Sequence, residues 1–156
     1  SFFLINTPLN CNYFVINTVV TFEEEPVTAG EMWNRINEVQ EKYCWLVYEL
    51  EGKVVGYAYA GKWKVRSAYK HTVESSVYLA PGYEGKGIGK QLYTALIERL
   101  KDLNIHAVIG GVAQPNEVSD KFHESMNFNK IGEFIEVGYK FNKWVNVRYY
   151  ELIFPS

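Results

Sequence analysis

A cluster of glycines at residues 85–89 constrains the fold of this chain more than any other segment. It follows a stretch rich in β-branched and aromatic residues (71–80), which predicts a strand. After the glycines, apolar residues recur at helical spacing, at Ile88, Leu92, Leu96, Leu100 and Leu103. Residues 105–113 are then almost continuously apolar, as expected of a strand buried on both faces. The order of strand, glycine turn, helix and buried strand predicts a βαβ crossover that joins two parallel strands.

The segments on either side predict antiparallel strands and further helices. Thr28 and Glu31 form a capping-box pattern at the start of a helix that extends to about residue 42. Glu51-Gly52 has the composition of a hairpin turn between strands at 44–50 and 53–60. The remaining expectations are a short strand at 2–6, an ambiguous segment at 9–20 for which a helix is one interpretation, a helix at 117–126, and strands at 130–140 and 144–154.

Together these elements predict a mixed α+β fold, with a twisted sheet of about six or seven strands and helices on both faces. The chain has 156 residues, of which 47% are hydrophobic, so it is long enough for one domain with its own core. No repeat or linker interrupts the sequence. We therefore expect a single domain over residues 1–156.

Charge and cysteine usage exclude several classes of protein. The net charge is −2, without a basic surplus, so no nucleic-acid partner is expected. No apolar run approaches the ~20 residues that span a bilayer, and the first residues lack the charged start of a signal peptide. Cys11 and Cys44 are expected to be reduced, buried thiols, and no cluster has metal-ligand spacing. These features predict a cytoplasmic protein with no membrane partner and no metal.

The glycine turn predicts an anion-binding site. A strand-to-helix junction presents unpaired backbone N–H groups and the positive end of the helix dipole, and glycines let an anion approach the backbone closely. A phosphate or pyrophosphate is the ligand that such a turn suits. The G-x-G-x-G spacing matches neither the Walker motif nor the dinucleotide fingerprint. The alternative is a tight turn that binds nothing.

Gly87 and Gly89 occupy the two small-residue positions of the pattern Gln/Arg-x-x-Gly-x-Gly/Ala, so this turn resembles that of the GNAT acetyltransferases. The resemblance implies a GNAT fold and a pyrophosphate site for acetyl-coenzyme A, formed by Gly85, Lys86, Gly87, Ile88, Gly89 and Lys90. Glu84 stands where the family has Gln or Arg. A carboxylate beside a pyrophosphate is unfavourable unless it points away, whereas Lys86 and Lys90 supply positive charge.

The chain also resembles the phosphinothricin N-acetyltransferase branch of that family over roughly residues 17 to 152. The similar blocks are 21–23, 45–47, 56–61, 63–69, 72–78, 115–116, 123–124 and 138–141. The resemblance implies direct acetylation of a small amino-acid-like amine such as phosphinothricin, methionine sulfoximine or methionine sulfone. It also implies a homodimer, for which the C-terminal aromatic residues would suit either an interface or a core: Tyr139, Phe141, Trp144, Tyr149 and Tyr150. Val145-Asn146 departs from the His-Asp that the branch often has after this Trp.

Amine acetylation requires a base, because an amino acid's ammonium group is mostly protonated near neutral pH. Glu74 is the best candidate, since Glu is disfavoured mid-strand and strand alternation turns it away from Val73 and Val77. The alternative is a solvent-facing strand residue. The resemblance implies that His123 is a second acid/base, whereas a lone helix His is more often a surface or capping residue.

The resemblance places the remaining site residues in three groups. Val77, Tyr78 and Leu79 match the strand that pairs with the pantetheine arm, and Asn116 is expected to bind the coenzyme or simply to start a helix. The third group matches the loop that contacts the substrate: Lys64, Arg66 and Tyr69. Arg and Lys suit an anionic substrate group, although a solvated basic loop is the alternative.

Three other functions stay open at this point. The first is a GNAT enzyme for a polyamine, an antibiotic or a peptide amine. The second is a non-catalytic acyl-coenzyme A sensor, which would keep the glycine turn but would not need Glu74. The third is a structural α+β domain, which would bind no acetyl-coenzyme A.

Overall fold

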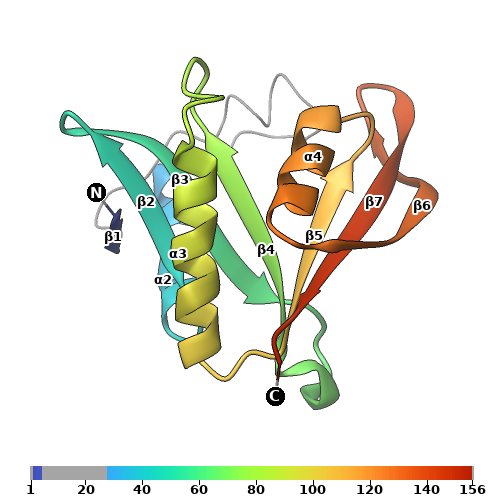
Figure 1. Cartoon of the computed structure of the whole chain (residues 1–156), viewed down its shortest axis with the longest axis horizontal. Coiled ribbons are helices and arrows are strands. Elements are labelled where there is room, and N and C mark those ends of the chain that lie inside the picture. The colour runs from blue at the N-terminus through green and yellow to red at the C-terminus, as the bar shows by residue number, and fades with distance from the viewer. Residues whose placement is uncertain (1, 5–27, 156) are drawn as a thin grey trace.

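The computed structural model describes residues 2–4 and 28–155, whose strands form one seven-stranded sheet in the order β1-β2-β3-β4-β5-β7-β6 (Figure 1). The strands are β1 (Phe2–Leu4), β2 (Trp45–Leu50), β3 (Lys53–Lys62), β4 (Thr72–Leu79), β5 (Ala107–Ala113), β6 (Asn129–Lys140) and β7 (Lys143–Ile153). The helices are α2 (Ala29–Gln40), α3 (Ile88–Asp102) and α4 (Glu117–Ser125), with a 3₁₀ turn, η1, at Ser67–Tyr69. The expected α+β class is confirmed. The ambiguous segment at 9–20 and Cys11 lie outside the described residues.

The β4–β5 pair is parallel and confirms the βαβ unit, whereas the other neighbouring strands are antiparallel. Its pairing runs from Thr72 opposite Ala107 to Ser75 opposite Gly110. Beyond that point both strands continue without pairing to each other, and Figure 1 shows them diverging. We call this opening the fork, bounded by residues 76–79 of β4 and 111–113 of β5.

Helices cover both faces of the sheet, as expected. In Figure 1, α3 and α4 lie in front of the sheet and α2 lies behind it. The buried face of α3 packs against Val73 and Val108 through Leu92, Leu96 and Leu100. On the other face, Met32 and Ile36 of α2 pack on Trp45, Val47 and Tyr57. Leu103 was expected on the buried face of α3, but it is 45% exposed because it caps the helix where the chain turns away at Asn104.

Short sequence patterns explain where helix α2 begins and where the chain turns between β2 and β3. Thr28 Oγ1 accepts the Glu31 N–H at 3.2 Å, and Glu31 Oε2 accepts the Thr28 N–H at 2.8 Å, so the capping box is confirmed. Glu51 and Gly52 both have positive φ (52° and 77°), as a tight two-residue hairpin turn requires. The hairpin turn joins β2 to β3 and places Leu50 opposite Lys53.

Candidate active site

The glycine turn ends in an open helix N-terminus. Gly85 and Gly87 have φ values of +73° and +78°, a left-handed conformation that glycine adopts without strain. Gly87 is the N-cap of α3 and supplies no side-chain hydrogen bond to the first turn. No atom of the described residues lies within 4 Å of where a Cβ would stand on either glycine. The turn therefore offers unobstructed backbone N–H groups to an anion.

Glu84 is held by the backbone of the same turn. Its Oε2 accepts the N–H of Gly82 at 2.8 Å, in an exposed position. Lys86 extends over the ring of Tyr83, with its Nζ 5.2 Å from the ring centroid. The one acidic residue at this signature position is thus fixed near the turn, where its charge opposes the binding of a phosphate.

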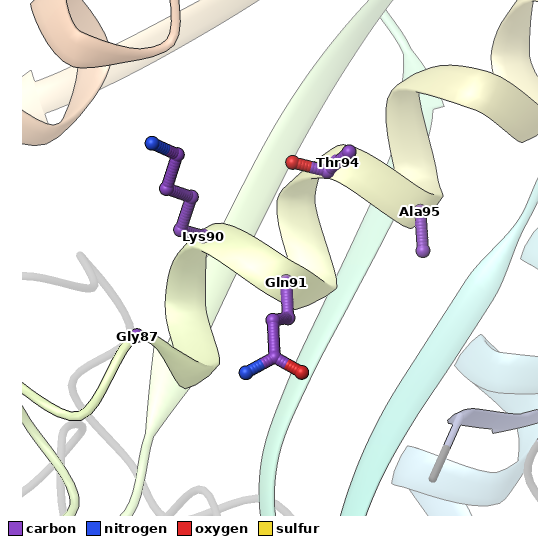
Figure 2. A pocket seen from close by; sticks show the side chains of 5 residues that line it. All are labelled: Gly87, Lys90, Gln91, Thr94 and Ala95. Carbon is purple, nitrogen blue, oxygen red and sulfur yellow. The ribbon is translucent and has the colours of Figure 1, made fainter.

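A cavity runs along the first two turns of α3 (Figure 2). Its volume is about 430 Å³, and it is lined by Gly87, Lys90, Gln91, Thr94 and Ala95. Lys90 and Thr94 also line a second cavity, which extends between α3, the C-terminal end of α4 and the end of β7, where Lys101 adds another cation. The start of α3 therefore opens onto two adjoining cavities that share Lys90 and Thr94.

The fork exposes one edge of β4. Val77, Tyr78 and Leu79 pair with Ala58, Tyr57 and Gly56 of β3 on one side. Within the described residues, no strand pairs with them on the β5 side. A strand edge of this kind suits an extended, amide-containing ligand, whose amides can form backbone hydrogen bonds. The structure thus places all three predicted residues where pairing to such a ligand is feasible.

Glu74 lies at the base of the fork, on the face that α2 covers. It is half-buried, between Gly61 of β3 and Ile109 of β5. Burial raises the pKa of Glu74 above its ordinary value, and the nearby Lys64 ammonium partly lowers it again. The side chain faces away from buried Val73, as strand alternation predicted, and it is not the solvent-facing residue of the alternative. A half-buried carboxylate with a raised pKa, where two strands stop pairing, suits general-base chemistry.

Tyr149 of β7, which the sequence did not single out as a neighbour of the candidate base, lies next to Glu74 and belongs to an aromatic cluster. Burial together with the Glu74 charge raises the pKa of the Tyr149 phenol. Trp63 and Phe134 both meet the Tyr149 ring edge-on, with centroids 5.7 Å and 5.6 Å away. Strand alternation along β7 sends Tyr149 and Tyr150 to opposite faces of the sheet. Only the strand order shows that Tyr149 is the one on the same face as Glu74.

His123 lies on the opposite face of the sheet and is only 5% exposed, so it is not the surface residue of the alternative. Its Nδ1 is 2.8 Å from the Ser119 carbonyl oxygen, which can only accept, so Nδ1 carries a proton. Nε2 faces Gly110, 2.6 Å from where a Cβ would stand. Burial lowers the pKa of His123, against the opposing effects of Ser119 and Asp120. The geometry favours a neutral ring whose Nε2 is an acceptor, and a role in proton transfer stays a prediction.

Asn116 starts α4, and its Oδ1 accepts the Ser119 N–H at 3.1 Å. The helix-start interpretation is therefore confirmed, and a contact with the coenzyme stays a prediction. Of the substrate-loop residues, Lys64 comes near enough to Glu74 to affect its pKa, and its Nζ lies 4.6 Å from the Trp63 ring centroid. Arg66 and Tyr69 are exposed at η1.

The part of the chain that the structure describes holds neither a candidate metal site nor a candidate membrane-spanning helix. Residues 2–4 and 28–155 contain no group of three or more His, Cys, Asp or Glu side chains that could hold a metal ion. In the same part of the chain, no helix is both long and apolar enough to cross a membrane. The titratable groups near the fork include the half-buried carboxylate of Glu74 and the buried imidazole of His123.

Comparisons with known proteins agree with this geometry. The model of the "Acetyltransferase (GNAT) family" matches residues 10–128. Phosphinothricin N-acetyltransferase of Streptomyces viridochromogenes is 36% identical over 140 residues, which cover 90% of this chain and 76% of that protein. L-methionine sulfoximine/L-methionine sulfone acetyltransferase of Salmonella typhimurium is 30% identical over 143 residues, which cover 90% and 83%. A GNAT superfamily phosphinothricin acetyltransferase from Sinorhizobium meliloti, crystallised with acetyl-coenzyme A, superposes with a TM-score of 0.86 at 32% identity, covering 90% of this chain and 77% of that one.

Proposed function

This chain belongs to the acetyltransferase (GNAT) family, and from that premise we propose that it acetylates a small amino-acid-like amine with Glu74 as general base. It is an acetyl-coenzyme A-dependent N-acetyltransferase. The names of its relatives support phosphinothricin, methionine sulfoximine and methionine sulfone as substrates. The observation that carries the proposal is the position of Glu74, a carboxylate with a raised pKa at the base of a fork that leads to the open glycine turn.

The residues present fit acetyl-coenzyme A, which supplies the acetyl group. The open backbone of Gly85, Gly87 and Gly89, with Ile88 between them, would hold the pyrophosphate, and Lys86 and Lys90 would add positive charge. The edge of β4 that faces the fork, at Val77, Tyr78 and Leu79, would pair with the pantetheine amides. Asn116 at the start of α4 is a further candidate contact.

Glu74 would take a proton from the substrate ammonium group. A base works best when its pKa lies near the working pH, and burial moves the pKa of Glu74 in that direction. Lys64, Arg66 and Tyr69 would hold the substrate's acidic group. Lys64 is the best placed of the three, because it already acts on Glu74 and lies against Trp63.

The test is thiol release from acetyl-coenzyme A with phosphinothricin, methionine sulfoximine, methionine sulfone, a polyamine and common amino acids as acceptors. We expect turnover on the glutamate-like and methionine-like analogues. Turnover on the polyamine alone would contradict the substrate assignment but not the activity. Binding of acetyl-coenzyme A without turnover on any acceptor would favour the sensor alternative.

Glu84→Gln is expected to strengthen the binding of acetyl-coenzyme A. The change removes a negative charge near the turn and keeps an oxygen that can accept the Gly82 N–H. At an effective dielectric near 20, two unit charges ~8 Å apart repel by roughly 2 kcal/mol before salt screening, so a severalfold decrease in Kd is expected. Isothermal titration with coenzyme A at low and high salt measures it. An unchanged Kd at low salt would show that Glu84 does not act on the phosphate.

We extend the proposal to a cytoplasmic, single-domain homodimer that uses no metal and binds neither nucleic acid nor membranes. The β6–β7 hairpin supports the dimer, because it exposes many large apolar side chains: Ile131, Phe134, Ile135, Val137, Tyr139, Phe141 and Trp144. Of the five aromatic residues for which the sequence left interface and core open, Tyr150 is fully buried and Tyr149 is at the active site. The other three are exposed and available to an interface.

A further inference from the structure

Two glycines flank Glu74 on the face of the sheet that α2 covers. Gly61 is the residue opposite Glu74 in the β3–β4 ladder, so a side chain there would lie beside the carboxylate. Gly111 follows Ile109, the β5 partner of Glu74, by two residues and therefore lies on the same face. A Cβ on Gly111 would stand 3.5 Å from Glu74 Oε1. The strands on both sides of the base thus present bare backbone to the substrate side.

Aromatic side chains bound this bare strip, which we call the glycine trough (Gly61, Glu74 and Gly111). Tyr149 is opposite Gly111 in the β5–β7 ladder, and its Cε1 lies 3.2 Å from where a Gly111 Cβ would stand. Trp63 follows β3 directly and meets the Tyr149 ring edge-on. Gly111 is exposed although it lies inside β5, and no atom of the described residues lies within 4 Å of a Gly61 Cβ position. The trough is therefore open at Gly61, whereas at Gly111 the Tyr149 ring and the Glu74 carboxylate leave room for a backbone without a side chain and little more.

We propose that Gly61 and Gly111 are specificity-determining residues that admit an amine carried by a branched carbon, as in an α-amino acid. The nitrogen has to reach the Glu74 carboxylate, and a branched carbon sends its carboxylate and its side chain to opposite sides of that nitrogen. The open space at Gly61 takes one substituent, and the missing side chain at Gly111 keeps the narrower side, between Glu74 and Tyr149, from being filled. An unbranched amine extends in one direction only and needs less width. This inference rests on the proposed function, because it requires Glu74 to face the reacting nitrogen.

The experiment compares Gly61→Ala and Gly111→Ala with the wild type on two matched acceptors. One is methionine sulfone, and the other is 3-(methylsulfonyl)propylamine, the same amine without its carboxylate branch. Each variant is expected to lose about 10-fold or more in kcat/KM on methionine sulfone, the range that one misplaced methyl group produces in a fitted pocket. The unbranched amine should lose much less, and the KM for acetyl-coenzyme A should not change.

Gly132→Ala is the matched control. Gly132 is a glycine inside strand β6, and no described atom lies within 4 Å of its Cβ position. Tyr149 of β7 stands between Gly132 and the trough. The variant should leave both acceptors unaffected. An unchanged kcat/KM on methionine sulfone in both trough variants, or an equal loss on both acceptors, would overturn the inference alone. Wild-type inactivity on every amine would instead overturn the proposed function and this inference with it.

Discussion

Glu74→Gln is expected to lower kcat for amine acetylation by about 10²- to 10⁴-fold, the usual contribution of a positioned general base. The amide keeps the size of the side chain but cannot take the proton from the substrate. Binding of acetyl-coenzyme A should persist, because the glycine turn and the edge of β4 that faces the fork do not involve this carboxylate. Steady-state thiol release gives kcat, and isothermal titration with coenzyme A gives the Kd.

The pH profile tests the same assignment independently. Burial raises the pKa of Glu74 above its ordinary value of 4.5, and the base acts only when it is deprotonated. The rate should therefore fall as the pH falls through that raised pKa. Because Lys64 lowers this pKa, Lys64→Met should move the acidic limb to higher pH.

Glu49→Gln on β2 is the control, since Glu49 is a half-buried strand glutamate away from the fork. It should keep wild-type turnover and an unchanged pH profile. A Glu74→Gln variant with wild-type turnover would refute the assignment of the base. Loss of both turnover and coenzyme binding would indicate a structural effect instead of a catalytic one.

Asp120→Ala is expected to destabilise the protein by about 3 kcal/mol, because the buried Tyr150 hydroxyl and two part-buried donors lose their acceptor. Asp120 is 8% exposed and accepts from Arg148 Nη1 at 2.6 Å, from the Tyr150 hydroxyl at 3.0 Å and from Gln114 Nε2 at 3.1 Å. These contacts tie α4, which carries His123, to β7. For a domain of this size the melting temperature should fall by roughly 6–12 °C in calorimetry.

Glu117→Ala provides the matched control in the same first turn of α4. Glu117 pairs with Lys121 at 2.8 Å, but both side chains are largely exposed, so the change should stay within about 0.5 kcal/mol. The double variant Asp120→Ala/Arg148→Ala should cost less than the sum of its single changes, since the two residues share one interaction. Equal losses for Asp120→Ala and Glu117→Ala would contradict the role of the network.

Much of the local structure was predictable because it depends on neighbours in the sequence. The capping box at Thr28, the hairpin turn at Glu51-Gly52 and the glycine turn before α3 are patterns of a few residues, and each appears where it was expected. The orientation of Glu74 follows from the two-residue period of a strand. The parallel β4–β5 pair followed from the crossover pattern.

Other expectations were wrong or incomplete because the periodicity of a sequence identifies which face of a helix or strand is apolar, but not which residues pack against that face. Leu103 continues the apolar spacing of α3, yet it lies where the helix ends and is exposed. His123 is buried against Tyr150 and Gly110, which come from two strands on either side of α4 in the sequence. No local pattern reports such a contact.

The sequence by itself determined the kind of fold and the position of the glycine turn, and it singled out Glu74 as the candidate base. Each of these depends on short-range geometry or on the intrinsic chemistry of one side chain. Only the tertiary structure decided what surrounds that base. Strand order and register place Gly61, Gly111 and Tyr149, which lie far apart in the chain, around Glu74. Hydrogen bonding between distant strands sets that arrangement, and the shape of the proposed substrate site follows from it.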